Sequence, residues 1–403
     1  MRSARANISK PVLRWARVQA GYSQEDATRK LQVKIERYQA WENDNEDLKP
    51  TIKQLRKIAK LYKRPVSLFY LTDPPQGFQP MRDFRRLPGD GMRPYSPALL
   101  HGMELAQQRR NLALELYKDV GEDIAEFVLK ASLEDEPEEL GARIRRDLGI
   151  TFSDQVQWRR HDALGPFKAW RRAIEDMHIL VFQISNVDRD EVSGFALAEN
   201  YLPIVAVNRK DVPNRRTFSL LHEFVHILLQ LSGASDLDVD ARRPPEEQKV
   251  EIFCNQVAAA ILMPGEQVLG LTSVQAHAGR STDWHDVEIR EASDLFGVSR
   301  EAFLRRLLTF GRTTRTFYEV KRQQYRAEFL DNFEKRQKQF KESEKKFRKN
   351  PPQDTFVELG RPYVRLVLDG VRHDLLTLNE ASGYLGNLRI RHFPKLEQRA
   401  YTG

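Results

Sequence analysis

Two histidines four residues apart constrain this chain more than any other feature of its sequence. His222 is followed directly by Glu223, and His226 completes the run. Side chains at this spacing lie on one face of an α-helix, so both imidazoles can bind one metal ion while Glu223 points toward a water molecule on it. Apolar residues recur at steps of three and four around the run, at Phe218, Leu221, Val225 and Leu228. The pattern predicts a partly buried zinc-binding helix that carries its general base.

A catalytic zinc ion needs a third protein ligand, and Glu251 is the best candidate. It opens an otherwise apolar, alanine-rich helix that is expected to end at Pro264. A buried carboxylate is costly there unless a positive charge neutralises it, which zinc would do. Asn255 lies one turn further on and could accept a hydrogen bond from the non-ligating nitrogen of a metal-bound histidine, which would orient that ring.

These motifs resemble the ImmA/IrrE family of gluzincin-like metallopeptidases, in which His-Glu-x-x-His is followed by a glutamate helix that ends in a Leu-Met-Pro-like stop. The similar blocks, in order, are Ala169 to Val181, Gly194 to Asn208, Arg215 to Leu229 and Glu251 to Pro264. The resemblance implies zinc on His222, His226 and Glu251, with Glu223 activating water for amide hydrolysis. Two positions depart from the small residues that are frequent in the family, namely Leu221 and Val225.

A β-hairpin is predicted ahead of the metal helix. Pro203 to Asn208 is rich in β-branched residues and can pair with Gly194 to Leu197 across the turn Ala198 to Asn200. Two interpretations remain open for it. The strand beside the metal helix could offer a free edge to an extended substrate, or the hairpin could only cover the helix.

The remaining histidines carry weaker signals. His178 lies in an apolar run at a helix-to-strand junction and is expected to be a core residue. Four other side chains could stabilise a developing oxyanion, and the sequence does not choose among them: Tyr201, Arg215, His277 and His285.

Composition limits the setting of this site. A chain of 403 residues should hold two or three domains. The single cysteine, Cys254, excludes an intrachain disulfide framework and fits a reducing compartment. The sequence has no apolar signal core at the N-terminus and no run long enough to span a membrane, so we expect a cytoplasmic protein without a membrane partner.

The positive charge is concentrated at the N-terminus. Residues 1–72 hold 16 Lys and Arg against 7 Asp and Glu, whereas the whole chain has a net charge of +8. Helices are predicted at Val12 to Arg17, after a cap at Ser23, at Lys34 to Glu42, and from Thr51 to Tyr62. This pattern resembles the XRE, or lambda-repressor-like, helix-turn-helix domain over about residues 11–71. A basic domain of this kind suggests DNA as a partner.

The resemblance implies that the third helix enters the major groove of DNA. It also implies that Gln24, at the start of the second helix, contacts a phosphate or a base edge. The side chains assigned to DNA are Gln24, Lys34, Arg37 and Gln39. Glu36 and the acidic loop Asn43 to Asp47 oppose this assignment, because they place negative charge near phosphate. Such domains also serve as dimerisation or partner-binding modules, and that alternative stays open.

The whole chain is expected to be mostly α-helical with a small β-sheet in the peptidase domain, an α+β fold, preceded by an all-α helix-turn-helix domain. The expected divisions are 1–72 as the helix-turn-helix domain, 73–135 as linker and connecting helices, 136–312 as the gluzincin-like peptidase domain, 313–350 as a long basic helix and 351–403 as a small C-terminal unit. Connecting helices are predicted at Pro97 to Lys118 and at Glu136 to Leu148, where Gly149 provides a stop. The segment Asp83 to Arg86 between the domains has no assigned role.

Three features are predicted after the zinc region. Ala292 to Leu307 looks like a second helix-turn-helix that packs on the peptidase core. Phe333, Phe340 and Phe347 recur every seven residues, so this helix could form the packing seam of a homodimer, or its basic face could contact nucleic acid. In the C-terminal unit, Tyr363 to Leu368 is predicted as a strand, and a capping box at Thr377 should open a short helix.

Two functions from different classes fit these patterns. The first is a DNA-associated zinc endopeptidase that cuts a regulatory protein, such as a repressor or an antitoxin, or its own chain. The second is a non-catalytic transcriptional regulator or antitoxin-like protein in which zinc is structural or sensory. The intact Glu223 favours the enzyme, because a site without activity does not need its base.

Overall fold

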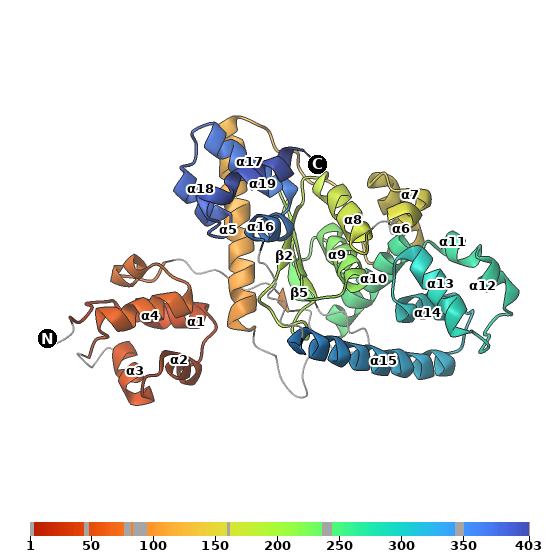
Figure 1. The fold of residues 1–403 in the computed structure, drawn as a ribbon, viewed down its shortest axis with the longest axis horizontal. Coiled ribbons are helices and arrows are strands. Elements are labelled where there is room, and N and C mark those ends of the chain that lie inside the picture. The colour runs from red at the N-terminus through yellow and green to blue at the C-terminus, as the bar shows by residue number, and fades with distance from the viewer. Residues whose placement is uncertain are drawn as a thin grey trace. The chain divides into compact units, whose positions relative to one another are not determined.

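A computed structural model describes residues 4–43, 48–75, 82–83, 95–158, 162–235, 244–342 and 350–402. The chain divides into two compact units (Figure 1). The first comprises Met1–Met81 and Leu87–Gln108, and the second comprises Arg82–Arg86 and Arg109–Gly403. No helix in the described ranges is long and apolar enough to cross a membrane.

The first unit has four short helices and a 3-10 turn in the described residues up to 75, and it also includes the start of a longer helix, α5 (Pro97–Val120). The short helices and the turn are α1 (Lys10–Gln19), α2 (Gln24–Leu31), α3 (Ile35–Glu42), α4 (Ile52–Tyr62) and η1 (Val66–Tyr70). The Ser23 hydroxyl accepts a hydrogen bond from the Asp26 backbone, and Thr51 and Gln54 form a capping box. The four helices predicted from the sequence are therefore confirmed.

A small aromatic core holds these helices together. Its fully buried members include Leu13, Tyr38, Trp41, Leu55, Ile58, Tyr62 and Phe69. The hydroxyl groups of Tyr38 and Tyr62 lie 2.5 Å apart, so α3 and α4 are joined by a polar contact inside the apolar core.

The second unit contains a five-stranded mixed sheet in the order β1-β5-β3-β4-β2. The strands are β1 (Arg82–Asp83), β2 (Leu180–Ile184), β3 (Gly194–Leu197), β4 (Ile204–Asn208) and β5 (Gly233–Ser235). The predicted hairpin is confirmed, because β3 and β4 pair antiparallel with Gly194 opposite Val207. The alternative in which the hairpin offers a free edge is wrong, because β3 also pairs with β5, and β4 also pairs with β2.

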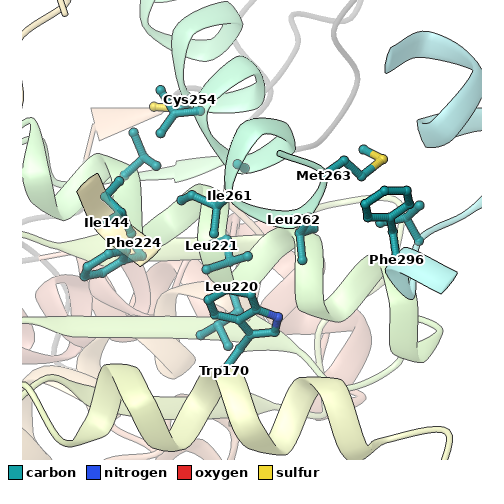
Figure 2. Close-up of a cluster of buried hydrophobic side chains, with 14 of the residues drawn as sticks. Ile144, Trp170, Leu220, Leu221, Phe224, Cys254, Ile261, Leu262, Met263 and Phe296 are labelled. Atoms are coloured by element: carbon teal, nitrogen blue, oxygen red, sulfur yellow. The ribbon is translucent and has the colours of Figure 1, made fainter. Parts of the chain in front are cut away.

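The predicted zinc motif lies on one of four helices that pack on the sheet or on one another. They are α6 (Pro137–Asp147), α8 (Gly165–Glu175), α9 (Pro213–Leu228) and α10 (Pro245–Leu262). Helix α9 packs on β3 and β4, and α8 and α10 pack on α9. The apolar contacts of this core, which include Trp170, Leu220, Phe224 and Ile261, are shown in Figure 2.

One glycine permits the close packing of α6 on α10. A Cβ atom at Gly141 would lie 2.8 Å from the Cβ atom of Ala260, which is shorter than real contacts allow. Glycine and alanine at the crossing let the two backbones approach, so α6 fixes the position of the helix that carries Glu251.

The remaining helices before the C-terminal segment are α5 (Pro97–Val120), α7 (Phe152–Trp158), α11 (Gly265–Leu269), α12 (Thr272–Ala276), α13 (Asp286–Phe296), α14 (Arg300–Thr309) and α15 (Arg315–Glu342). The connecting helices predicted from the sequence correspond to α5 and α6, and Gly149 follows α6 with a φ of 63°. Helices α13 and α14 are the second helix-turn-helix. Phe296, Phe303 and Leu307 from this element belong to the same hydrophobic core as the apolar residues of α9 and α10, which supports its structural role.

The C-terminal segment is entirely helical. Its elements are α16 (Pro351–Leu359), α17 (Arg361–Arg372), α18 (Leu378–Tyr384), η2 (Ile390–His392) and α19 (Phe393–Tyr401). The capping box at Thr377 is confirmed. The strand predicted at Tyr363 to Leu368 is wrong, because this stretch lies inside α17. Tyr363, Val364 and Val367 are buried at helical spacing, so packing of one helix face overrides their local preference for strands.

The expectation for His178 is also wrong. Its side chain is exposed, in a turn between α8 and β2 where its φ is 60°. The turn reverses the chain direction and points the imidazole outward, whereas Ile179 beside it is buried. Some predictions fall outside the described residues: the acidic positions 44–47, residues 84–86 of the connecting segment, the side chains of Phe333 and Phe340, and Phe347.

Candidate metal centre

Helices α9 and α10 bring three potential metal ligands together. His222 and His226 come from α9 and Glu251 comes from α10, and the three side chains are between 0% and 1% exposed. Pro213 occupies the first turn of α9, where its missing N–H costs nothing. Helix α10 ends at Leu262, just before Met263 and Pro264, as the sequence predicts.

The distances among the donor atoms match those of a single tetrahedral site. The Nε2 atom of His226 lies 3.1 Å from Oε1 of Glu251 and 3.2 Å from Nε2 of His222. The Nε2 atom of His222 lies 3.5 Å from Oε2 of Glu251. Two ligands at typical zinc bond lengths and a tetrahedral angle are separated by about 3.3 Å. The three donors therefore fit around one zinc ion.

The charges of the ligands also suit a divalent cation. Burial raises the pKa of the Glu251 carboxyl, but the neighbouring His222 and His226 outweigh burial and lower it to about 2. Burial lowers the pKa of the His226 imidazole, although Glu251 acts in the opposite direction. A carboxylate and neutral imidazoles are the protonation states that zinc requires. This donor set passes the chemical test for a zinc site.

Glu223 is enclosed between the metal helix and β3. Its carboxyl group is fully buried, and neither oxygen has a hydrogen-bond partner among the described residues. A Cβ atom at Gly194 would lie 2.8 Å from Cγ and 3.0 Å from Oε1 of Glu223, so the absence of a side chain on β3 makes room for this carboxyl group. Burial, followed by the negative charge of Glu251, raises the pKa of Glu223 well above its usual range.

The structure adds one polar residue that the sequence reasoning missed. The Ser235 hydroxyl, on β5, is 1% exposed and lies 3.3 Å from Nε2 of His226. Strand β5 is three residues long and consists of Gly, Ala and Ser, so it carries neither apolar alternation nor β-branched residues. No sequence signal could have placed this serine beside the metal ligands.

The other residues expected to support the site are placed differently. Asn255 is buried on α10, but neither atom of its amide forms a hydrogen bond with a described residue, so its support of a histidine stays a prediction. Among the oxyanion candidates, His277 contacts Glu288 and the Tyr201 carbonyl accepts from Arg110. His285 precedes the first turn of α13.

Arg215 has the clearest connection to the site. Its Nη2 atom donates to the Ser193 hydroxyl over 3.2 Å, and the Ser193 backbone donates to the carbonyl of Ser235. Arg215 is therefore linked through Ser193 to β5, the strand whose Ser235 contacts His226. Its Nε atom also faces the buried carboxylate of Asp211 at 3.5 Å.

The residues assigned to DNA lie on α2, on α3 and, in the case of Lys34, at the N-cap of α3. Lys34, Arg37 and Gln39 are exposed, and so is Glu36. Gln24 is half-buried, and its amide donates to Glu42 over 2.8 Å while its carbonyl accepts from Gln39 over 3.2 Å. Contact of these side chains with DNA remains a prediction.

Comparison with known protein families confirms both resemblances. Residues 175–308 match the family model of the IrrE N-terminal-like domain, and residues 13–69 match a helix-turn-helix family model. The chain thus contains one region similar to the IrrE N-terminal-like domain and one region similar to helix-turn-helix domains. One relative is the radiation response metalloprotease IrrE of Deinococcus deserti, which is 37% identical over 82 residues. This similarity covers 19% of the chain and spans 28% of the length of that relative.

Proposed function

We propose that this protein is a zinc-dependent endopeptidase that works in association with DNA and hydrolyses a peptide bond in a regulatory protein, such as a repressor or an antitoxin. The observation that carries the proposal is the convergence of His222, His226 and Glu251 at zinc-like distances beside the buried Glu223. The match to the IrrE N-terminal-like domain supports the peptidase activity, and the helix-turn-helix match supports the DNA partner. The single buried cysteine fits a cytoplasmic location.

The chain supplies both the binding and the proton-transfer functions that peptide hydrolysis requires. His222, His226 and Glu251 would hold the zinc ion, which when bound supplies Lewis acidity to water and to the scissile carbonyl group. Glu223 would take a proton from the attacking water and deliver it to the amide nitrogen that leaves. Its enclosed position between α9 and β3 suits this transfer, because bulk water does not compete for the proton.

The second candidate is a transcriptional regulator or antitoxin-like protein in which zinc is structural or sensory. One observation favours it: all three ligands and Glu223 are almost completely buried, and a structural zinc ion needs no access for a substrate. The presence of Glu223 favours the enzyme instead, because a structural site needs only its ligands.

The test compares the wild-type protein with Glu223→Gln and with Glu246→Gln. Glu246 is exposed in the first turn of α10, so its substitution controls for loss of a carboxylate. Zinc content is measured by elemental analysis, and mass spectrometry follows cleavage of repressor and antitoxin proteins encoded beside this chain. We expect equal zinc content in all three proteins and cleavage by all except Glu223→Gln. Equal cleavage by Glu223→Gln, or a wild-type protein that takes up no zinc, would refute the assignment.

A further inference from the structure

We propose that Ser235 is a positioning residue for the general base: its hydroxyl group donates a hydrogen bond to Glu223 when His226 binds the metal. This inference rests on the proposed peptidase function and adds Ser235 to the residues that serve it. The proposal combines three observations on β5, β3 and the metal helix.

The first observation is the pairing of β5 with β3. Ser235 is the register partner of Gly194 in the antiparallel ladder. Side chains of directly opposite residues project from the same face of a sheet, with their Cβ atoms about 5 Å apart. A Cβ atom at Gly194 would point at Glu223 and touch its Cγ and Oε1 atoms. The Ser235 side chain therefore projects from the face of the sheet against which Glu223 lies.

The second observation is the set of partners that the Ser235 hydroxyl has. It lies 3.3 Å from Nε2 of His226, the same atom that faces Glu251 and His222. A nitrogen atom that binds a metal ion has no lone pair left to accept a hydrogen bond. With the metal in place the hydroxyl group needs another acceptor, and a buried hydroxyl without one is costly.

The third observation is the state of Glu223. Both of its carboxylate oxygens are buried without a hydrogen-bond partner among the described residues. The Ser235 hydroxyl group, which loses its acceptor when His226 binds the metal, and the Glu223 carboxyl group, which has no donor, therefore lie at the same face of the sheet, where a change of the Ser235 rotamer can bring them together.

The backbone holds Ser235 in place for this role. Its carbonyl accepts a hydrogen bond from the Ser193 backbone over 2.9 Å, next to the pairing with Gly194. The serine is 1% exposed, so water does not compete for its hydroxyl group. A serine fixed in this way would hold one carboxylate oxygen of Glu223 and leave the other oxygen for the attacking water.

The experiment uses the full chain with Ser235→Ala, Ser235→Thr and the control Ser232→Ala. The Ser232 hydroxyl accepts from the Ala198 backbone, so the control removes a hydroxyl group beside the same strand without facing Glu223. We expect Ser235→Ala to lower kcat about 10- to 100-fold with little change in KM, the range for a lost hydrogen bond to a charged group. Ser235→Thr keeps the hydroxyl group and should restore most of kcat, and Ser232→Ala should match the wild type.

Two measurements do not depend on activity. Zinc affinity and the absorption spectrum of the cobalt-substituted protein should be unchanged in Ser235→Ala, because the serine is not a ligand. A cobalt spectrum of altered coordination together with a large loss of zinc affinity would overturn the proposal and make Ser235 a ligand.

A double-mutant cycle of the zinc-loaded protein, with Ser235→Ala and Glu223→Ala, tests the interaction directly. We expect the two substitutions to be coupled about three- to tenfold in the unfolding equilibrium constant. A wild-type protein that cleaves nothing would count against the peptidase function while this cycle still tests Ser235. Normal kcat in Ser235→Ala with no coupling in the cycle would overturn the inference and leave the peptidase function standing.

Discussion

Replacing Asp211 by asparagine should remove a pH-dependent loss of stability that this carboxyl group imposes on the start of the metal helix. Asp211 lies two residues before α9, and its side chain is 0% exposed. Burial raises the pKa of Asp211 to about 6, although Arg215, Arg189 and Arg216 act against burial. Neither carboxylate oxygen has a hydrogen-bond partner among the described residues, so the charged form is poorly compensated.

The direction of the effect follows from the raised pKa. Between the ordinary value of 3.8 and the folded value of about 6, the folded state binds a proton that the unfolded state has lost. The free energy of unfolding therefore falls as the pH rises through this window, by about 3 kcal/mol in total. Of this amount, about 2 kcal/mol should be lost between about pH 4.5 and pH 8. Asp211→Asn cannot titrate and should not show this loss.

The assay is urea unfolding of the wild type and of Asp211→Asn at several pH values across that window. As the pH rises from about 4.5 to 8, the unfolding free energy of Asp211→Asn should increase relative to that of the wild type by about 2 kcal/mol. Asp190→Asn is the control, because its side chain is 74% exposed and the substitution removes a charge near the same arginines. Parallel stability curves for the wild type and Asp211→Asn over the whole range would show that the reasoning is wrong.

Two further substitutions test the packing around each site. Gly194→Ala would place a methyl group 2.7 Å from the Ala206 carbonyl and 2.8 Å from Glu223. We therefore expect the free energy of unfolding, measured with urea, to fall by about 1–3 kcal/mol, and cleavage to be impaired. The control Gly383→Ala should not be destabilising, because the added methyl group meets open space. Unchanged stability and cleavage in Gly194→Ala would contradict the close approach of β3 to the base. Glu42→Gln breaks a buried ion pair with Arg17 at 2.8 Å and should destabilise the first unit by on the order of 3 kcal/mol, measured as faster hydrogen exchange in α1 and α2. Exchange at the wild-type rate would mean that the pair contributes little.

Local signals in the sequence were sufficient for most of the helices and for the spacing of the metal ligands. Caps such as Ser23 and Thr51 and stops such as Gly149 act within a few residues of the chain, so the sequence predicts them directly. The pair His222 and His226 is likewise local. Glu251 was inferred from the cost of burying a carboxylate, and the structure brings it within reach of both histidines.

Features that depend on distant contacts were not predictable in the same way. Strands β1 and β5 are two and three residues long, and their pairing is determined by the sheet rather than by their own composition. Ser235 was missed for this reason. The stretch from Tyr363 to Leu368 was misassigned as a strand because its β-branched and aromatic residues are typical of strands, whereas packing of α17 decides its structure.

The packing of α16 beside β2 has a consequence for how this protein avoids self-association. Strand β2 is the last strand on its side of the described sheet, and Leu180, Val181 and Phe182 within it are buried. Gln183 donates to the Val357 carbonyl of α16, and Arg209 forms ion pairs with Asp354 and Glu358 on the same helix. An uncovered apolar edge strand is a template for strand addition by another molecule. We therefore expect α16 to protect β2 from pairing with a strand of another molecule. A chain shortened before α16 would expose this apolar edge strand and should aggregate more readily.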